Sequence, residues 1–97
     1  MLYGMYLTQS ATMSDAVALA LSRAIRAERA RAGLSQDAFG RRMGWSRATV
    51  SHVETLVRRV QADELPDLCG ALGVTFAELF AKVPAEDRAK LGLMRTT

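Results

Sequence analysis

The sequence is short of the residues from which active sites and metal centres are commonly built. Its 97 residues include one cysteine, Cys69, and one histidine, His52. A single cysteine excludes an internal disulfide and suits a reducing compartment, so we expect a cytoplasmic protein. As the only histidine, His52 has no partner in the sequence for histidine-based metal or triad chemistry. Since zinc-protease, phosphate-loop and nucleophile-elbow motifs are also missing, we expect no enzyme, no metal and no cofactor.

Long apolar runs are missing as well. No stretch reaches the length of about 18 apolar residues that a membrane-spanning helix needs, so we expect no membrane association. Residues 1–7 lack the basic start of a secretory signal peptide. With 49% apolar residues, a chain of this length is expected to form one domain around one small core.

Positive charge is concentrated in one part of the chain. Residues 14–61 contain nine arginines and four acidic residues, which gives a net charge of +5, whereas residues 62–97 have a net charge of −2. A surface that binds nucleic-acid phosphates needs a local excess of this kind. By itself, the pattern is equally compatible with an ordinary solvated surface.

Residues 35–54 have the pattern of two short helices joined by a tight turn. Ser35 and Ser46 stand where N-cap residues begin a helix, and Gly44 can end the first helix in the left-handed conformation. Gly40 lies inside that helix, where glycine costs about 0.5–1 kcal/mol relative to alanine, so we expect another helix to cross close to it. Together these features predict a helix-turn-helix, whose second helix can enter a DNA major groove.

The same region resembles a known family. The runs Gly-Leu-Ser-Gln at 33–36, Gly-Trp-Ser-Arg at 44–47 and Thr-Val-Ser-His-Val-Glu at 49–54 resemble the lambda-repressor and Cro-like (xenobiotic-response-element) family of helix-turn-helix domains. The run at 71–80 is similar to the signature that joins this family's fourth and fifth helices. We therefore expect a compact all-α fold with helices at about 14–32, 35–43, 46–55, 62–72 and 76–81.

Within these bounds we expect an N-terminal extension at 1–13, a helix-turn-helix domain at 14–82 with its motif at 35–55, and a C-terminal segment at 83–97. The apolar extension is either a dimerisation arm or a mis-assigned start, in which case Met13 begins the protein. Pro84 is expected to begin a last short helix that ends near Leu91. By resemblance to the family, the C-terminal segment is expected to serve in dimerisation.

Local chemistry predicts further helix ends. Ser14 is expected to cap the first helix, and Thr75 with Glu78 fits a capping box at the start of the last one. Cys69 falls on the apolar face of the helix at 62–72, where we expect it to be a small buried side chain.

The recognition helix at 46–55 is expected to read bases. Val50 and Val53 form its apolar stripe. Arg47 is the best candidate for base readout, with two hydrogen bonds to guanine, and a phosphate contact is the alternative. The residues that can point away from the apolar stripe, and are therefore expected to contact bases, are Ser46, Arg47, Ala48, Ser51 and His52.

Contacts to the DNA backbone are expected from Gln36, Thr49, Arg58, Arg59 and Arg29. The role of Gln36, at a helix N-terminus where amide dipoles favour anions, is implied by the resemblance. The resemblance also implies an ion pair between Arg29 and Glu54, which would lock the first helix to the third and turn a free N–H toward phosphate.

Two stretches depart from the family. Trp45 replaces a smaller residue in the turn, and either half-buries against the flanking helices or packs on the sugar-phosphate edge. After Glu54, where the family often has Asn-Gly or Arg-Gly, this chain has Thr-Leu-Val-Arg-Arg-Val at 55–60. Either the recognition helix continues for another turn, or the loop takes an uncommon path.

The expected function is that of a sequence-specific DNA-binding transcriptional regulator, a dimeric repressor that occupies an operator. Its partner would be double-stranded DNA with an inverted repeat, and with so little chain beyond the motif we expect no small-molecule ligand. Phage repressors or Cro proteins, restriction–modification controllers and antitoxins share this size and layout. The alternative is a protein-interaction adapter that binds a partner through the helical bundle and the apolar N-terminal arm.

Overall fold

The structure, a computed structural model, describes residues 13–85, and this part of the chain is entirely α-helical apart from turns and one 3₁₀ helix. The expected all-α fold with five helices is confirmed, and residues 13–85 contain no strand. The elements are α2 (Met13–Arg31), α3 (Gln36–Met43), α4 (Arg47–Glu54), the 3₁₀ helix η1 (Ala62–Glu64), α5 (Leu65–Leu72) and α6 (Phe76–Phe80).

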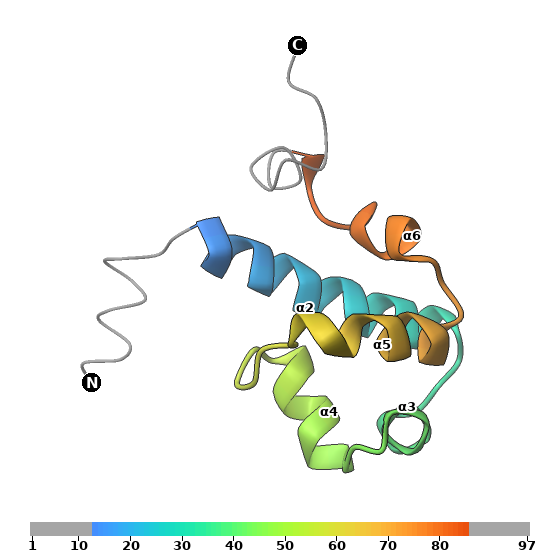
Figure 1. Ribbon diagram of the computed structural model, residues 1–97. Coiled ribbons are helices and arrows are strands. Elements are labelled where there is room, and N and C mark those ends of the chain that lie inside the picture. Colours follow the sequence, from blue (N-terminus) through green and yellow to red (C-terminus); the bar gives the residue numbers. More distant parts are fainter. Residues whose placement is uncertain (1–12, 86–97) are drawn as a thin grey trace, which may run out of the picture.

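The long helix α2 is the axis of the fold. Figure 1 shows α2 running across the middle of the fold, with α3 and α4 below it and α6 above it. The helix α2 contacts both α4 and α6, while α5 contacts α3 and α6. Within the described residues, none of the helices is long and apolar enough to cross a membrane.

Every helix contributes to one shared core. The largest fully buried side chains include Ile25 of α2, Phe39 of α3, Val50 of α4, Leu68 of α5 and Leu79 of α6. Burying a side chain of this size contributes about 1.5–3 kcal/mol. The short helices α3 to α6 are therefore held by packing against each other and against α2, since helices of five to eight residues are marginal alone.

The helix ends around the predicted motif follow local chemistry. The hydroxyl of Ser35 accepts a hydrogen bond from the Ala38 N–H at 3.0 Å, and that of Ser46 accepts one from the Thr49 N–H at 3.1 Å. Gly44 ends α3 with a φ of 71°, in the left-handed region. These three predictions are confirmed, because each depends only on residues within one helical turn.

Thr75 and Glu78 form the predicted capping box at the start of α6. Two other predicted helix boundaries differ from the structure. The prediction that Ser14 caps the first helix is wrong, because α2 already includes Met13. The helix predicted at 62–72 is divided into η1 and α5, and Pro66 lies in the first turn of α5, where its missing N–H removes no helical hydrogen bond.

Some predictions lie outside the described residues. These are the roles given to residues 1–12, most of the last short helix after Pro84, and the dimerisation expected of the C-terminal segment, most of which is not described.

Candidate nucleic-acid interface

The turn between α3 and α4 passes very close to Gly40. A Cβ atom on Gly40 would lie 2.5 Å from the backbone oxygen of Trp45 and 3.3 Å from Cγ2 of Val50. The Gly40 carbonyl also accepts a hydrogen bond from the Trp45 N–H at 2.8 Å. The expected close approach at Gly40 is therefore made by the turn itself and by the first core residue of α4. This contact fixes the start of α4 against α3.

The N-terminal half of α4 presents polar and small side chains to solvent. Val50 and Val53 are buried on its inner face, and Ser46, Arg47, Ala48 and His52 are exposed. The separation into a buried and an exposed face follows from the helical spacing of the two valines. The exposed set contains four of the five residues that the sequence assigned to base contact.

Thr49 and Ser51 of α4 are partly buried. The Thr49 and Ser46 hydroxyls lie 3.0 Å apart, and the hydroxyl of Thr55 donates to the Ser51 carbonyl at 2.8 Å. Ser51, the fifth residue assigned to base contact, is thus less open than the other four. These contacts order both ends of the helix without using the side chains of Arg47 or His52.

Arg29 and Glu54 form a buried ion pair beneath this surface. Nε of Arg29 lies 2.5 Å from Oε2 of Glu54, and Nη2 lies 3.1 Å from Oε1. The two side chains are 14% and 2% exposed. Nη1 of Arg29 donates to the Leu34 carbonyl at 2.7 Å, and Nε2 of Gln36 donates to Oε1 of Glu54 at 3.3 Å. The network joins α2, α3 and α4, and it engages two of the residues that the sequence assigned to phosphate.

The loop after α4 takes the uncommon path. The Val57 N–H donates to the His52 carbonyl at 2.8 Å, and the Leu56 N–H donates to the Val53 carbonyl at 3.3 Å. This pair of bonds is the Schellman pattern that usually places glycine at the left-handed position. Here Leu56 occupies that position with a φ of 61°. The recognition helix therefore ends at Glu54.

Arg58 is bound on two sides. Its guanidinium lies 4.9 Å from the centroid of the Trp45 ring, and its Nη1 and Nη2 donate to Glu64 at 3.1 and 2.7 Å. These hydrogen bonds hold the pKa of Glu64 below its usual range. The charge of Arg58, which the sequence assigned to phosphate, is thus already paired within the protein.

Trp45 is partly buried and joins this cluster to the core. Its ring meets Phe39 edge to face, with centroids 6.1 Å apart and planes at 81°. Of the two alternatives for Trp45, the structure has the ring packed inside the domain. The sequence did not predict the contact between Trp45 and Arg58. The only signal for it was that both Trp45 and the stretch 55–60, which contains Arg58, depart from the family pattern.

Two further arginines are held by other elements. Arg59 forms an ion pair with Asp15 in the first turn of α2. Arg42 donates to the Ala71 carbonyl in the last turn of α5 at 2.9 Å, where free carbonyls accept cationic donors. Arg41, beside it in α3, is exposed.

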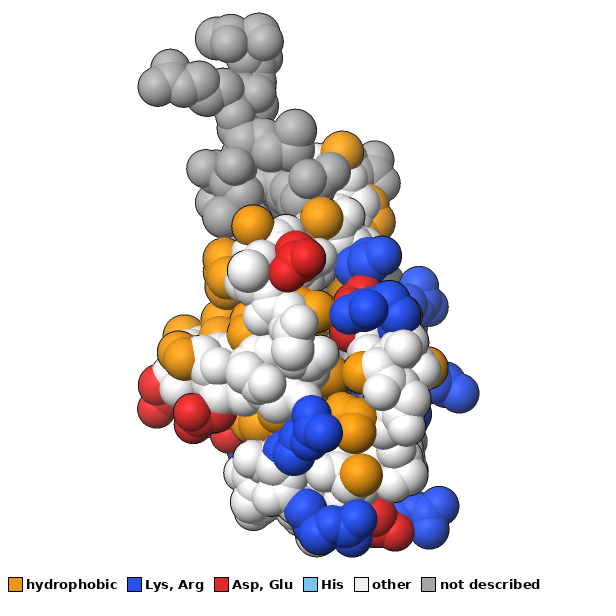
Figure 2. Space-filling view, turned by 90° about the vertical axis from the view of Figure 1, so that its right-hand side faces the viewer, with side chains coloured by type: hydrophobic (Ala, Val, Ile, Leu, Met, Phe, Trp, Pro, Cys, Tyr) orange, Lys and Arg blue, Asp and Glu red, His pale blue; other side chains and the backbone are white. Residues whose placement is uncertain are grey.

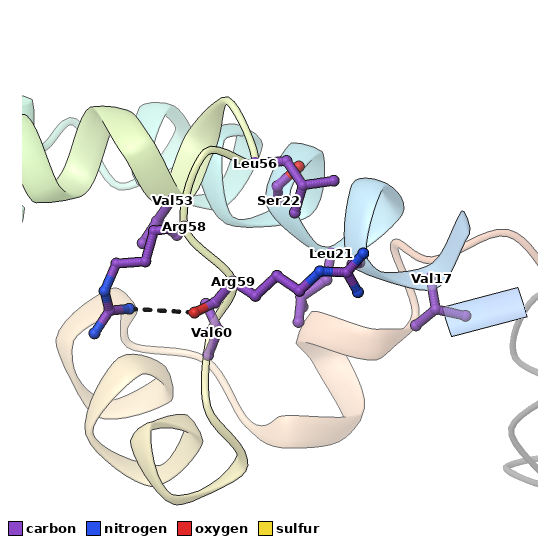
Figure 3. A pocket seen from close by; sticks show the side chains of 9 residues that line it. Val17, Leu21, Ser22, Val53, Leu56, Arg58, Arg59 and Val60 are labelled. Carbon is purple, nitrogen blue, oxygen red and sulfur yellow. Dashed lines mark hydrogen bonds between the residues drawn. The ribbon is translucent and has the colours of Figure 1, made fainter. Parts of the chain in front are cut away.

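An apolar hollow of about 200 Å³ lies between α2 and the loop at 55–60. Figure 3 shows Arg59 lying along its rim toward α2, while Arg58 points to the opposite side of the loop. Its apolar walls come from Val17, Ala18, Leu21, Val53, Leu56 and Val60.

Charge is unevenly placed on the surface. Figure 2 shows Lys and Arg side chains along one edge and the lower end of the visible face, whereas a group of acidic side chains lies at the opposite edge. Within residues 13–85, no three His, Cys, Asp or Glu side chains are grouped to hold a metal ion.

Comparison with known proteins agrees with this geometry. Residues 20–81, well over half of the chain, match the family described as the helix-turn-helix domain. No curated protein and no solved structure is significantly similar to the chain. The matched range contains most of α2 and all of α3, the turn, α4, α5 and α6. This chain belongs to the helix-turn-helix domain family.

Proposed function

We propose that this chain is a sequence-specific DNA-binding transcriptional regulator that places α4 in the major groove. The observation that carries the proposal is the exposed first turn of α4, with Ser46, Arg47 and Ala48 outward and Val50 inward. In helix-turn-helix proteins the N-terminal residues of the second helix contact base edges. Arg47 is the residue of choice for guanine, because its planar fork matches O6 and N7.

The charge of the motif supports the same reading. The net charge of +5 on residues 14–61 lies in the part of the chain that contains α3 and α4. Arg41 and Arg47 are both exposed there. An interface of this sign attracts phosphates from a distance and gives binding that weakens steeply with salt. Gln36, Thr49 and Arg59 are the proposed phosphate contacts, whereas all three nitrogens of Arg29 already donate within the protein.

The finer description is also a proposal. The motif residues at 33–36, 44–47 and 49–54 support membership of the lambda-repressor and Cro-like subfamily. By analogy with that subfamily, we propose a cytoplasmic homodimer that acts as a repressor. Such a dimer would bind an inverted repeat with half-sites about 34–36 Å apart, one turn of DNA. Phage, restriction–modification and antitoxin regulators all fit this description.

Selection of binding sites from a random duplex pool tests the proposal. We expect an inverted repeat for the unmodified chain. Arg47→Ala should relax one base in each half-site and cost about 1–3 kcal/mol for the selected site. Arg23→Ala removes the same charge from an exposed position of α2 and serves as the matched control, which should select the same repeat. A uniform loss across all sequences in Arg47→Ala would instead identify a phosphate contact.

A second candidate is the protein-interaction adapter. The observation in its favour is the apolar hollow beside the loop (Figure 3), next to Val57, whose side chain is 72% exposed. Exposed apolar patches often mark protein contacts. If the pool yields no enriched sequence and DNA binding is weak and independent of sequence, the adapter becomes the better description.

A further inference from the structure

The loop after the recognition helix is tied back to the turn before it. We propose that Arg58 is a positioning residue for α4, joining Trp45 before the helix to Glu64 after it, and that Arg58 does not itself contact phosphate. The inference rests on the proposed DNA-binding function and concerns how the base-reading helix is held. We call Trp45, Arg58 and Glu64 the clamp.

The clamp encloses α4 from both ends. Trp45 directly precedes the N-cap residue Ser46, and Arg58 lies four residues after the end of α4. On one side Arg58 stacks on the Trp45 ring, which is itself packed against Phe39. On the other side it binds Glu64 through two nitrogens. The turn before α4 and the loop after it therefore share one side chain.

Both partners of Arg58 are fixed independently. The Phe39 contact anchors the Trp45 ring in the core. Oε1 of Glu64 also accepts a hydrogen bond from the Gln61 N–H at 2.8 Å, which ties the carboxylate to the start of η1. A guanidinium between two fixed partners holds them in one relative position, because its planar fork has a single geometry that satisfies both.

The loop at 55–60 contains a residue in a disfavoured backbone conformation, which surrounding contacts such as those of Arg58 must hold in place. Leu56 adopts the left-handed conformation, which side chains other than glycine disfavour. A residue held in this way persists only where the surrounding contacts impose it. The two N–H groups that follow bond back to α4, and Arg58 supplies the next contact along the chain.

The charge balance argues against a phosphate contact. The side chains of Arg58 and Glu64 are only 35% and 21% exposed. Nη1 and Nη2 of Arg58 both donate hydrogen bonds to Glu64 and are therefore already occupied. Arg58 and Arg59 also lie on opposite sides of the loop (Figure 3). The two adjacent arginines therefore cannot both contact the phosphates of one DNA strand.

The first experiment compares DNA binding of variants that balance charge. The double variant Arg58→Met with Glu64→Gln keeps the net charge of the pair at zero. For the selected site we expect about a tenfold loss of affinity, equivalent to about 1.4 kcal/mol, with binding to unrelated DNA and the salt slope unchanged. A phosphate contact would instead lower the salt slope by about 0.9 per arginine and weaken all DNA binding.

Glu64→Gln alone gives outcomes of opposite sign. If Arg58 positions α4, loss of the ion pair lowers the ratio of specific to non-specific affinity. If Arg58 reaches phosphate, releasing it from Glu64 tightens binding to every sequence. Arg58→Lys separates the two roles again, because an ammonium group keeps a phosphate contact but lacks the planar fork that the clamp requires. A Lys variant that binds the selected site like the unmodified chain overturns the proposal.

The second experiment does not need DNA. Trp45 is the only tryptophan of the chain, so emission excited at wavelengths that Tyr3 and Tyr6 do not absorb reports this ring alone. Arg58→Ala uncovers the ring face and should shift the emission to longer wavelength, while Arg23→Ala should leave it unchanged. Circular dichroism of each variant checks that the helices are intact, and the milder Arg58→Met keeps the test available if Arg58→Ala does not fold.

The two experiments can fail separately. If the chain selects no DNA sequence, the proposed function is wrong, and the emission assay still decides whether Arg58 holds Trp45. If the emission of well-folded Arg58→Ala matches that of the unmodified chain, the clamp is wrong even when DNA binding is specific.

Discussion

Two glycines inside short helices should respond to alanine in opposite directions. Gly40 lies in α3 and Gly70 in α5, and both helices are eight residues long. Alanine in an unobstructed helix is favoured over glycine by about 0.5–1 kcal/mol. At Gly70 nothing lies within 4 Å of the new Cβ, so Gly70→Ala should raise the free energy of unfolding by about this amount.

At Gly40 the new Cβ would meet backbone. Its calculated position is 2.5 Å from the Trp45 carbonyl oxygen, closer than real Cβ atoms approach, and 3.3 Å from the Val50 side chain. A backbone atom cannot rotate away, so the turn must shift, and overpacking of this kind costs about 1–3 kcal/mol. After subtracting the helical gain, Gly40→Ala should lower the free energy of unfolding by about 0.5–2 kcal/mol.

Thermal unfolding followed by circular dichroism measures both effects. A change of 1 kcal/mol shifts Tm by about 4–8 °C in a domain of this size, so the two variants should move apart on either side of the parent. Each is the matched control of the other, because the chemical change is identical. A Gly40→Ala protein as stable as Gly70→Ala would refute the close approach of the turn to α3.

Three further predictions concern the ionisable groups. Arg29→Ala should lower the free energy of unfolding by about 3–5 kcal/mol in urea titrations, because it leaves the buried Glu54 without its main partner; replacing Glu54 by leucine as well should recover most of the loss. Because Arg58 holds the pKa of Glu64 below its usual 4.5, the stability from this pair is complete above about pH 4.5 and is lost as the pH falls through the lower folded-state value. Acid unfolding of Glu64→Gln should lack that component, and an unchanged pH profile would contradict it. Burial raises the pKa of the Cys69 thiol, so a thiol reagent should react slowly with the folded chain and quickly in denaturant, whereas rapid native labelling would show that the thiol is open.

The features that the sequence predicted well are those decided within one turn of chain. Ser35 and Ser46 cap their helices because a hydroxyl before a helix finds an N–H three residues later. Gly44 takes the left-handed conformation for a similarly local reason. The apolar spacing of Val50 and Val53 then determines which face of α4 is left exposed to solvent. This explains why the fold and the exposed set on α4 followed from the sequence.

The partner that each arginine side chain binds was harder to predict. An arginine stem has enough rotatable bonds to reach several neighbours, and the choice depends on elements that are distant in sequence. Arg42 reaches α5, and Arg58 reaches both Trp45 and Glu64, although the sequence assigned Arg58 to phosphate and gave Arg42 no partner. The path of the loop was also undetermined, because Leu56 carries none of the glycine signal that marks a left-handed residue.

The turn before α4 is constrained at two levels by the same residue. The backbone of Trp45 lies against Gly40, where only hydrogen fits, and its side chain lies between Phe39 and Arg58. Neither contact occupies the exposed face of α4, so the side chains proposed to read bases stay open while the helix that carries them is fixed. A helix held in its binding position before DNA arrives loses less conformational freedom on association. Under the proposed function, Trp45 contributes to recognition by holding Arg47 in place, without touching DNA.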